Sequence, residues 1–209
     1  MVDKKYLIID LFSGLGGASE SMMNSDAWDV IRIEKNADLA NSVPNTFEFD
    51  IVEENDRLIS DLEGKLGGHS YSKIIIWASP ECKEWSQGYA SKKNKMLRDG
   101  IDYVPNMSQV LAIMRIIDRI RPDYWLLENV VGGIPFINLA IGPPRLKHRP
   151  WIFWGDFPLF NIDIDHNHKS KNDVSSRNPM RYWIRSKIPF DISDKLRLAI
   201  ENQTTLGDF

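Results

Sequence analysis

The single cysteine of the chain has the surroundings of a nucleophile. Cys82 lies in the segment Ala78-Ser79-Pro80-Glu81-Cys82-Lys83-Glu84-Trp85-Ser86, directly after an isoleucine-rich run. A thiol at the end of a buried strand and next to Lys83 is placed to attack an electrophilic carbon. The alternative is an inert buried cysteine. One cysteine also excludes an intrachain disulfide and a zinc site built from several cysteines, so no metal site is predicted.

A carboxylate with possible acid–base chemistry follows a second apolar run. Glu128 stands in Trp125-Leu126-Leu127-Glu128-Asn129-Val130. Partial burial at the end of a strand would raise its pKa and let it donate a proton. The alternative is a strand-end carboxylate that caps the next turn.

A glycine-rich turn provides the third group of candidate residues. The segment Asp10-Leu11-Phe12-Ser13-Gly14-Leu15-Gly16-Gly17 follows the first apolar run and leads into a predicted helix. Glycines let the backbone approach a ligand closely, and a carboxylate such as Glu34, 20 residues beyond Gly14, can accept hydrogen bonds from a ribose. With Asp50, three acidic groups would line one sheet edge, which suits a nucleoside cofactor without phosphates. The alternative is a tight turn with no ligand.

The elements that must position these groups alternate between strands and helices. Apolar runs predict strands at residues 6–11, 29–33, 47–49, 73–78, 123–127 and 151–154. Helical patterns predict the start of a helix at 18–23 and helices at 107–120 and 192–200. The segments 83–105 and 156–187 are predicted to be loops. This alternation predicts an α/β fold with a mostly parallel sheet and helices on both faces.

Composition and charge limit the class of protein. The chain has 209 residues, 43% of them hydrophobic, enough for one domain or one domain with a small appendage. No apolar run reaches the roughly 18 residues of a membrane span, and the N-terminus lacks the apolar stretch of a signal peptide, so we expect an intracellular protein, cytoplasmic in a prokaryotic host. The net charge is −3, yet segments 82–98, 145–149 and 169–187 carry +4, +3 and +5. Such segregation suits a polyanion ligand; solvated basic loops are the alternative.

Taken in chain order, these segments resemble the DNA cytosine-C5 methyltransferases. Residues 10–17 resemble the first motif of that family, 80–86 its nucleophile motif and 128–130 its E-N-V motif. Arg145, Lys147 and Arg149 resemble its Q-x-R-x-R motif, and Ile188-Pro189 with the following helix resembles its last motif. The resemblance covers roughly residues 5–155 and the tail, and it implies a methyltransferase-like Rossmann fold.

The resemblance also implies a role for each matching residue. Cys82 would attack C6 of cytosine, Glu128 would protonate N3 and Arg149 would hold O2. S-adenosyl-L-methionine would be the methyl donor, and the base would be flipped out of cytosine-containing DNA. The implied cofactor residues are Asp10, Phe12, Ser13, Gly14, Leu15, Gly16, Gly17, Glu34, Asp50, Ile51 and Pro80. The implied or expected DNA contacts are Lys83, Ser86, Gln87, Lys92, Lys93, Lys95, Arg145, Lys147, Arg177, Arg181 and Arg185.

Departures from the family pattern leave alternatives open. Glu81 stands where the family usually has proline, and an adjacent carboxylate disfavours a thiolate. We expect a catalytic domain at 1–155, a short basic segment at 156–187 in place of a target-recognition domain, and a helix at 188–209 that packs back. We therefore expect relaxed sequence specificity. The alternative is a partner protein that recognises the DNA sequence. The competing functions are methylation of RNA or of a free cytosine nucleotide, and a catalytically silent regulatory homologue.

Overall fold

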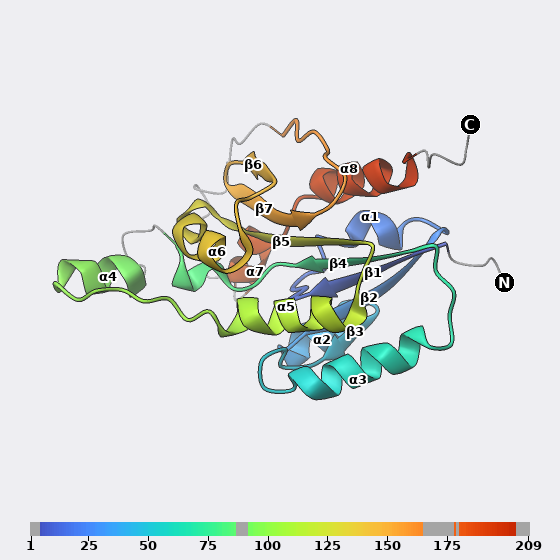
Figure 1. Ribbon diagram of the computed structural model, residues 1–209, viewed down its shortest axis with the longest axis horizontal. Coiled ribbons are helices and arrows are strands. Elements are labelled where there is room, and N and C mark those ends of the chain that lie inside the picture. The colour runs from blue at the N-terminus through green and yellow to red at the C-terminus, as the bar shows by residue number, and fades with distance from the viewer. Residues whose placement is uncertain (1–4, 87–91, 165–177, 179, 204–209) are drawn as a thin grey trace.

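The chain folds around a single mixed sheet (Figure 1). The computed structural model describes residues 5–86, 92–164, 178 and 180–203. Seven strands lie in the order β3-β2-β1-β4-β5-β7-β6. They are β1 (Tyr6–Leu11), β2 (Trp28–Glu34), β3 (Thr46–Glu48), β4 (Lys73–Ala78), β5 (Tyr124–Val130), β6 (Leu146–His148) and β7 (Trp151–Asp156). The first five are mutually parallel, and β7 runs antiparallel to both neighbours, so the predicted mostly parallel sheet is confirmed.

Helices cover both faces of the sheet, as predicted. Every residue of β1 is buried, which explains its uninterrupted apolar run. Leu7 and Ile9 pack with the face of α3 (Asn55–Leu66), α5 (Ser108–Ile120) and α6 (Ile134–Ile141), whereas Ile8 packs with the face of α1 (Glu20–Met23) and α8 (Phe190–Glu201). The remaining helices are α2 (Ala37–Ser42), α4 (Lys92–Arg98) and α7 (Arg181–Ser186).

The structure corrects the sequence-based elements at several places. The segments 83–105 and 156–187 contain α4 and α7, and α4 projects from the body of the molecule (Figure 1). The helices α2, α3 and α6 and the strand β6 were not predicted. β5 continues to Val130, so Glu128 lies within the strand, opposite Phe153 of β7, rather than after it.

The last helix brings the C-terminal part of the chain back to the glycine turn. The backbone N–H of Ser21 in α1 donates to Ser193 Oγ of α8 at 3.1 Å, and Arg197 Nε donates to Ser21 Oγ at 2.7 Å. Segments 172 residues apart thus form one layer on this face. Across the described part of the chain, no helix combines the length and the apolar character needed to cross a bilayer.

Candidate functional site

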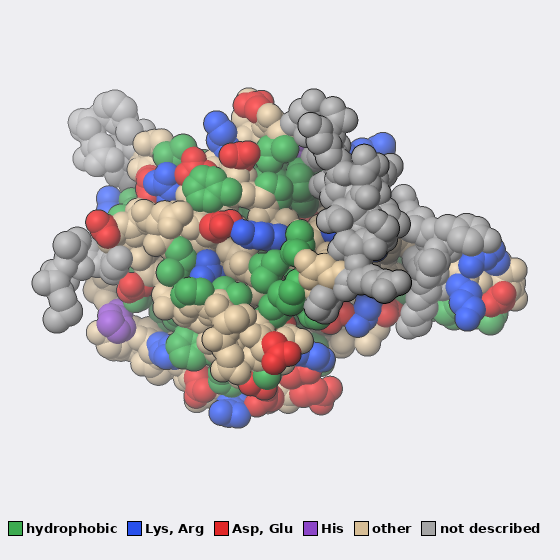
Figure 2. Space-filling model, turned by 180° about the vertical axis from the view of Figure 1, so that it is seen from behind, with side chains coloured by type: hydrophobic (Ala, Val, Ile, Leu, Met, Phe, Trp, Pro, Cys, Tyr) green, Lys and Arg blue, Asp and Glu red, His purple; other side chains and the backbone are tan. Residues whose placement is uncertain are grey.

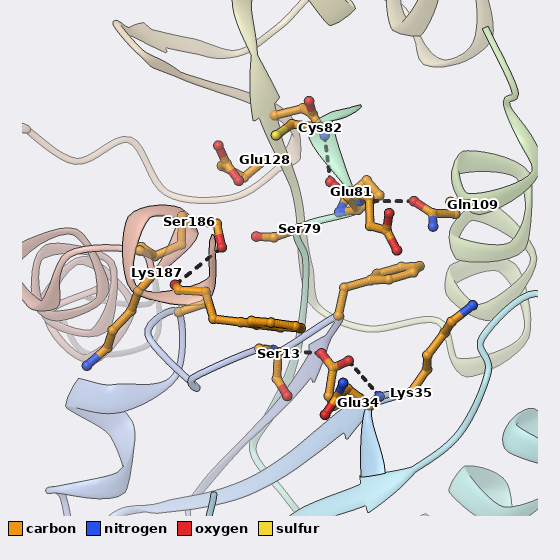
Figure 3. A pocket seen from close by; sticks show the side chains of 18 of the residues that line it. Ser13, Glu34, Lys35, Ser79, Glu81, Cys82, Gln109, Glu128, Ser186 and Lys187 are labelled. Atoms are coloured by element: carbon orange, nitrogen blue, oxygen red, sulfur yellow. Dashed lines mark hydrogen bonds between the residues drawn. The ribbon is translucent and has the colours of Figure 1, made fainter. Parts of the chain in front are cut away.

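A large pocket lies where the central parallel strands end (Figure 3). Its walls contain most of the cofactor residues expected from the sequence, namely Asp10, Phe12, Ser13, Gly14, Leu15, Gly17, Glu34, Asp50, Ile51 and Pro80. Cys82 and Glu128 line the same pocket, together with Lys83. Residues at the ends of all five parallel strands therefore converge on one cavity, which is where ligands bind in open α/β sheets.

The glycine turn and Glu34 are tied together by the backbone. Gly14 N–H donates to Glu34 Oε2 at 2.9 Å, and Asn36 N–H donates to Glu34 Oε1 at 2.9 Å. Gly14 has φ +52° and Phe12 has φ +60°, so the chain turns sharply on both sides of Ser13. The two backbone donors hold the Glu34 carboxylate in one orientation, with further lone pairs left for a ligand.

Two glycines of the turn are packed closely against other parts of the protein. A Cβ on Gly16 would stand 2.7 Å from Arg32 Nε, and Gly16 does not line the pocket. A Cβ on Gly17 would stand 2.4 Å from the carbonyl oxygen of Ile188. An added side chain would therefore displace a buried guanidinium at Gly16 and the segment before α8 at Gly17, while Gly17 itself still lines the pocket.

A buried polar network stands behind the turn. Arg32 Nε donates to Ser19 Oγ at 2.8 Å, and Ser19 Oγ donates to Asp10 Oδ2 at 2.6 Å. Arg32 also donates to the carbonyl oxygens of Gly16 and Pro44, at 3.2 and 2.9 Å. Burial raises the pKa of Asp10 to about 6, against the lowering effect of Ser19 and Arg32. The network joins β1, β2 and the turn into one rigid unit.

Two buried polar atoms at the pocket wall have no hydrogen-bond partner among the described residues. They are Asp10 Oδ1 and Ser13 Oγ, and both residues line the pocket. An unsatisfied buried polar atom is costly, so these positions suit a ligand with polar groups of its own.

Asp50, at the far side, is held by Lys35 at 3.0 Å and by the N–H of Val52 at 3.0 Å. Although burial acts in the opposite sense, these bonds lower the pKa of Asp50.

Cys82 and Glu128 face a common space in a low-dielectric environment (Figure 3). Burial raises the pKa of Glu128 to about 7, against the lowering effect of a hydrogen bond with Ser79. Burial, then the charge of Glu128, raises the pKa of the Cys82 thiol. Asn129 Nδ2 donates to the carbonyl oxygen of Pro80 at 2.9 Å, so the residue after Glu128 holds the segment before Cys82. The arrangement provides a neutral thiol beside a carboxyl that is half protonated near neutral pH.

Glu81, the departure from the family pattern, has partners of its own. Its carboxylate forms an ion pair with Lys83, and its backbone N–H donates to Gln109 Oε1 at 2.9 Å. Glu81 still contributes to the raised pKa of Cys82, after burial and Glu128. The neighbouring Lys83 therefore compensates part of the negative charge that Glu81 brings to the nucleophile.

Several expected site residues lie away from the pocket. Arg149 is exposed and does not line it, although the adjacent Pro150 does. Arg145 pairs with Asp156 at 3.4 Å. Ser86, Lys95 and Lys147 also lie outside the pocket lining. Gln87 and Arg177 fall outside the described residues, as do the side chains of Lys92 and Lys93.

The basic segment 156–187 contributes a wall that the sequence did not indicate. Arg181 and Arg185, expected to contact phosphates, line the pocket from α7. Tyr182 and Trp183 of the same helix line it as well. The sequence analysis also did not identify Arg32 and Gln109 as residues that support the site. A charged residue inside the apolar run of β2 could have indicated that Arg32 is buried.

The chain is similar to proteins of one family. The family model of C-5 cytosine-specific DNA methylases matches residues 6–134, well over half of the chain. No curated protein matches it. Among solved structures it is similar to a candidate DNA modification methyltransferase encoded within a prophage (E. coli), with 20% identity and a TM-score of 0.43 over 65% of this chain and 35% of that chain. This chain thus spans about a third of the length of that protein.

Proposed function

The chain belongs to the C-5 cytosine-specific DNA methylase family, and on this premise we propose that it transfers a methyl group from S-adenosylmethionine to C5 of cytosine in DNA. The resemblance and the methyltransferase-like α/β fold inferred from the sequence are both confirmed. The observation that carries the proposal is the convergence of Cys82 and the buried Glu128 on the pocket of the glycine turn.

The pocket residues fit S-adenosylmethionine. Asp10 Oδ1 and Ser13 Oγ offer buried polar atoms without partners among the described residues to the amino-acid part. Glu34, fixed by two backbone N–H groups, has the orientation to accept hydrogen bonds from a ribose, and Asp50 with Ile51 lies beyond it for the adenine. When bound, the cofactor supplies an activated methyl group. The acidic residues around the turn favour this ligand over a pyrophosphate.

The roles that the family pattern gives to Cys82 and Glu128 can be combined with their raised pKa values. The Cys82 thiol gives up its proton to solvent as Sγ bonds to C6, and Glu128 delivers its proton to N3. C5 then becomes nucleophilic and accepts the methyl group. The C5 proton is then lost to solvent, the Sγ–C6 bond breaks and N3 returns its proton to Glu128, which releases the product and the thiolate. Protonated Glu128 serves both steps, because it donates to the base and no longer repels the thiolate.

The DNA substrate is supported by charge rather than by a recognition domain. α4 carries Lys95 and Arg98 in its last turn, and these basic residues suit phosphate contacts. Cytosine must leave the stack before Cys82 can reach C6. The family pattern assigns O2 to Arg149, which lies next to the pocket-lining Pro150. Because the segment 156–187 is short, we expect it to hold few contacts to base edges and the sequence specificity to be relaxed.

Nucleoside analysis of methylated substrates tests this function. Purified protein with S-adenosylmethionine should form 5-methylcytosine in duplex DNA, detected by mass spectrometry and located by bisulfite sequencing. Parallel reactions with RNA and with cytidine nucleotides test the competing substrates. Formation of 5-methylcytosine only in RNA or free nucleotides would contradict the DNA assignment. No product from any substrate, with cofactor binding intact, would favour the catalytically silent homologue.

A further inference from the structure

The short helix α7 forms a side of the pocket that connects its two halves. Its residues face the pocket together with the glycine turn and Glu34 on one side and with Cys82 and Glu81 on the other. Ser186 and Lys187 stand across the cavity from Glu81 and Gln109 (Figure 3). α7 belongs to the stretch 156–187, which the resemblance to the family leads us to expect in place of a recognition domain.

Close packing fixes the position of this helix. Lys187 Nζ, directly after α7, forms an ion pair with Glu20 at 2.8 Å. The backbone of Ile188 approaches Gly17 so closely that no Cβ fits between them. Ile188 and Ile192 are buried against the α1 face of the sheet. The end of α7 is therefore joined rigidly to the glycine turn.

Trp183 lies on the cofactor side of the pocket. Its Cδ1 is 3.7 Å from the place where a Cβ of Gly14 would stand, so the indole lies beside the glycine turn. Gly14 is the residue whose N–H holds Glu34. The indole thus borders the space assigned to the cofactor.

Tyr182 is oriented differently and lies among the charges of the nucleophile. Its ring is nearly perpendicular to that of Trp183, with 87° between planes and 5.3 Å between centroids. Burial, then the charges of Cys82, Glu81 and Glu34, raises the pKa of Tyr182 to about 12. Half of its surface, 50%, is nevertheless exposed, so this pocket-lining side chain has area available for contact with a ligand.

We propose that α7 supplies an aromatic partition to the methyl-transfer pocket, in which Trp183 packs on the cofactor and Tyr182 packs on the target cytosine. This inference rests on the proposed function and names the residues that hold the two reactants. An extruded base loses its stacking neighbours, and an aromatic ring restores that contact. Any base has a π face, so Tyr182 holds the cytosine without reading the sequence around it. The segment in place of a recognition domain therefore acts on the flipped base itself.

Paired aromatic substitutions separate the two roles. Tyr182→Ala should raise the apparent KM for DNA about tenfold or more, since base–aromatic stacking has that magnitude. Its affinity for S-adenosylmethionine, measured by calorimetry, should stay near that of the unaltered protein. Tyr182→Phe keeps the ring and should restore most of the KM. Trp183→Ala should weaken cofactor binding about tenfold or more, with a smaller effect on the KM for DNA at saturating cofactor.

Phe190→Ala is the matched control. Phe190 is an aromatic residue of similar exposure, 43%, at the start of α8, and it does not line the pocket. Thermal unfolding of each variant separates loss of folding from loss of binding. An unchanged KM for DNA in folded, active Tyr182→Ala would overturn the inference, as would equal losses in Phe190→Ala. Absence of methylation by the unaltered protein would contradict the proposed function itself, and with it the assignment of Tyr182.

Discussion

Glu128 is buried with a pKa of about 7, compared with an ordinary value of 4.5, so its ionisation opposes folding. The folded state binds this proton more tightly than the unfolded state does. The contribution of Glu128 to stability is therefore greatest below pH 4.5 and is lost as the pH rises to about 7. Glu128→Gln removes the charge, so the variant should gain stability over the unaltered protein as the pH rises through this window, by up to about 3 kcal/mol.

Chemical denaturation at pH 5 and pH 8 measures this difference. The methylation rate of Glu128→Gln should meanwhile fall strongly at both pH values, because the amide cannot deliver a proton. A stability difference that stays constant with pH would show that Glu128 titrates normally.

Gly16 illustrates a residue whose role the sequence could not give. Its φ is +71°, and Arg32 Nε would stand 2.7 Å from an added Cβ, so the backbone and the guanidinium both disfavour any side chain. We expect Gly16→Ala to destabilise the fold by about 2 kcal/mol, through backbone strain and displacement of buried Arg32.

Gly64 provides the control for that substitution. It lies within α3, and no atom stands within 4 Å of an added Cβ. Gly64→Ala should stabilise the protein by about 0.5–1 kcal/mol, since alanine is the better helix former. Unfolding free energies from urea titration compare the two; equal effects would contradict the assigned role of Gly16.

At the scale of elements, strands were easier to predict than their surroundings. The apolar run of β4 was predicted at its observed bounds, because a central parallel strand is apolar on both faces. α7 was missed because six residues give no helical period, and its place is set by tertiary contacts with Gly17 and Glu20. The antiparallel direction of β7 depends on the path of the chain through β6, which residue pattern does not encode.

Site residues on regular strands could likewise be predicted from the sequence, whereas those placed by tertiary contacts could not. Glu34 ends an apolar run, Glu128 interrupts one and Cys82 follows one after a short turn, so the strands predict that all three lie near the sheet edge. Tyr182 and Trp183 were not predicted, because they reach the pocket from a distant part of the chain. Site residues attached to regular elements can be identified from the sequence more readily than residues that the tertiary fold brings to the pocket from a distant segment.

The two ends of the projecting segment that carries α4 are joined by hydrogen bonds to Glu84. Tyr103 O–H donates to Glu84 Oε2 at 2.7 Å, and the N–H of Asn106 donates to the same oxygen at 3.2 Å. Burial and the charge of Glu84 raise the pKa of Tyr103, so its hydroxyl remains a donor. Tyr103→Phe should therefore make trypsin cleavage in α4 about tenfold faster, through loss of a charged hydrogen bond.

Tyr71→Phe is the control for this prediction. Tyr71 O–H donates to Asp29 Oδ2 at 2.8 Å, at the opposite end of the strands. Tyr71→Phe removes a similar hydrogen bond and leaves the contacts of the α4 segment unchanged. Mass spectrometry of timed digests identifies the cleavage sites, and equal rates in α4 for both variants would contradict the anchoring role of Tyr103.

At the scale of the whole molecule, charge is segregated although the net charge is −3. Lys and Arg side chains gather on the projecting end that holds α4, whereas many acidic side chains, with some basic ones among them, lie along the lower edge of the view (Figure 2). If the basic end contacts phosphates, DNA affinity should fall with salt by a slope of about −0.9 per contact. Lys95→Ala should reduce the slope by about one contact, whereas Lys65→Ala, on α3, should leave it unchanged.

Fluorescence anisotropy at several salt concentrations provides these slopes. A flat dependence for the unaltered protein would favour a nucleotide substrate over the polymer. A loss of slope in Lys65→Ala equal to that in Lys95→Ala would place the DNA elsewhere on the surface.

Covalent trapping tests most directly whether Cys82 and the pocket around it perform cytosine C5 methylation. DNA that contains 5-fluorocytosine has no C5 proton to lose, so elimination of the enzyme from C6 is blocked after methyl transfer. With S-adenosylmethionine present, the account predicts a denaturation-resistant protein–DNA complex in which mass spectrometry locates the bond at Cys82, and no complex with Cys82→Ser. A complex that survives Cys82→Ser, or none with an unaltered protein that binds both DNA and cofactor, would contradict it.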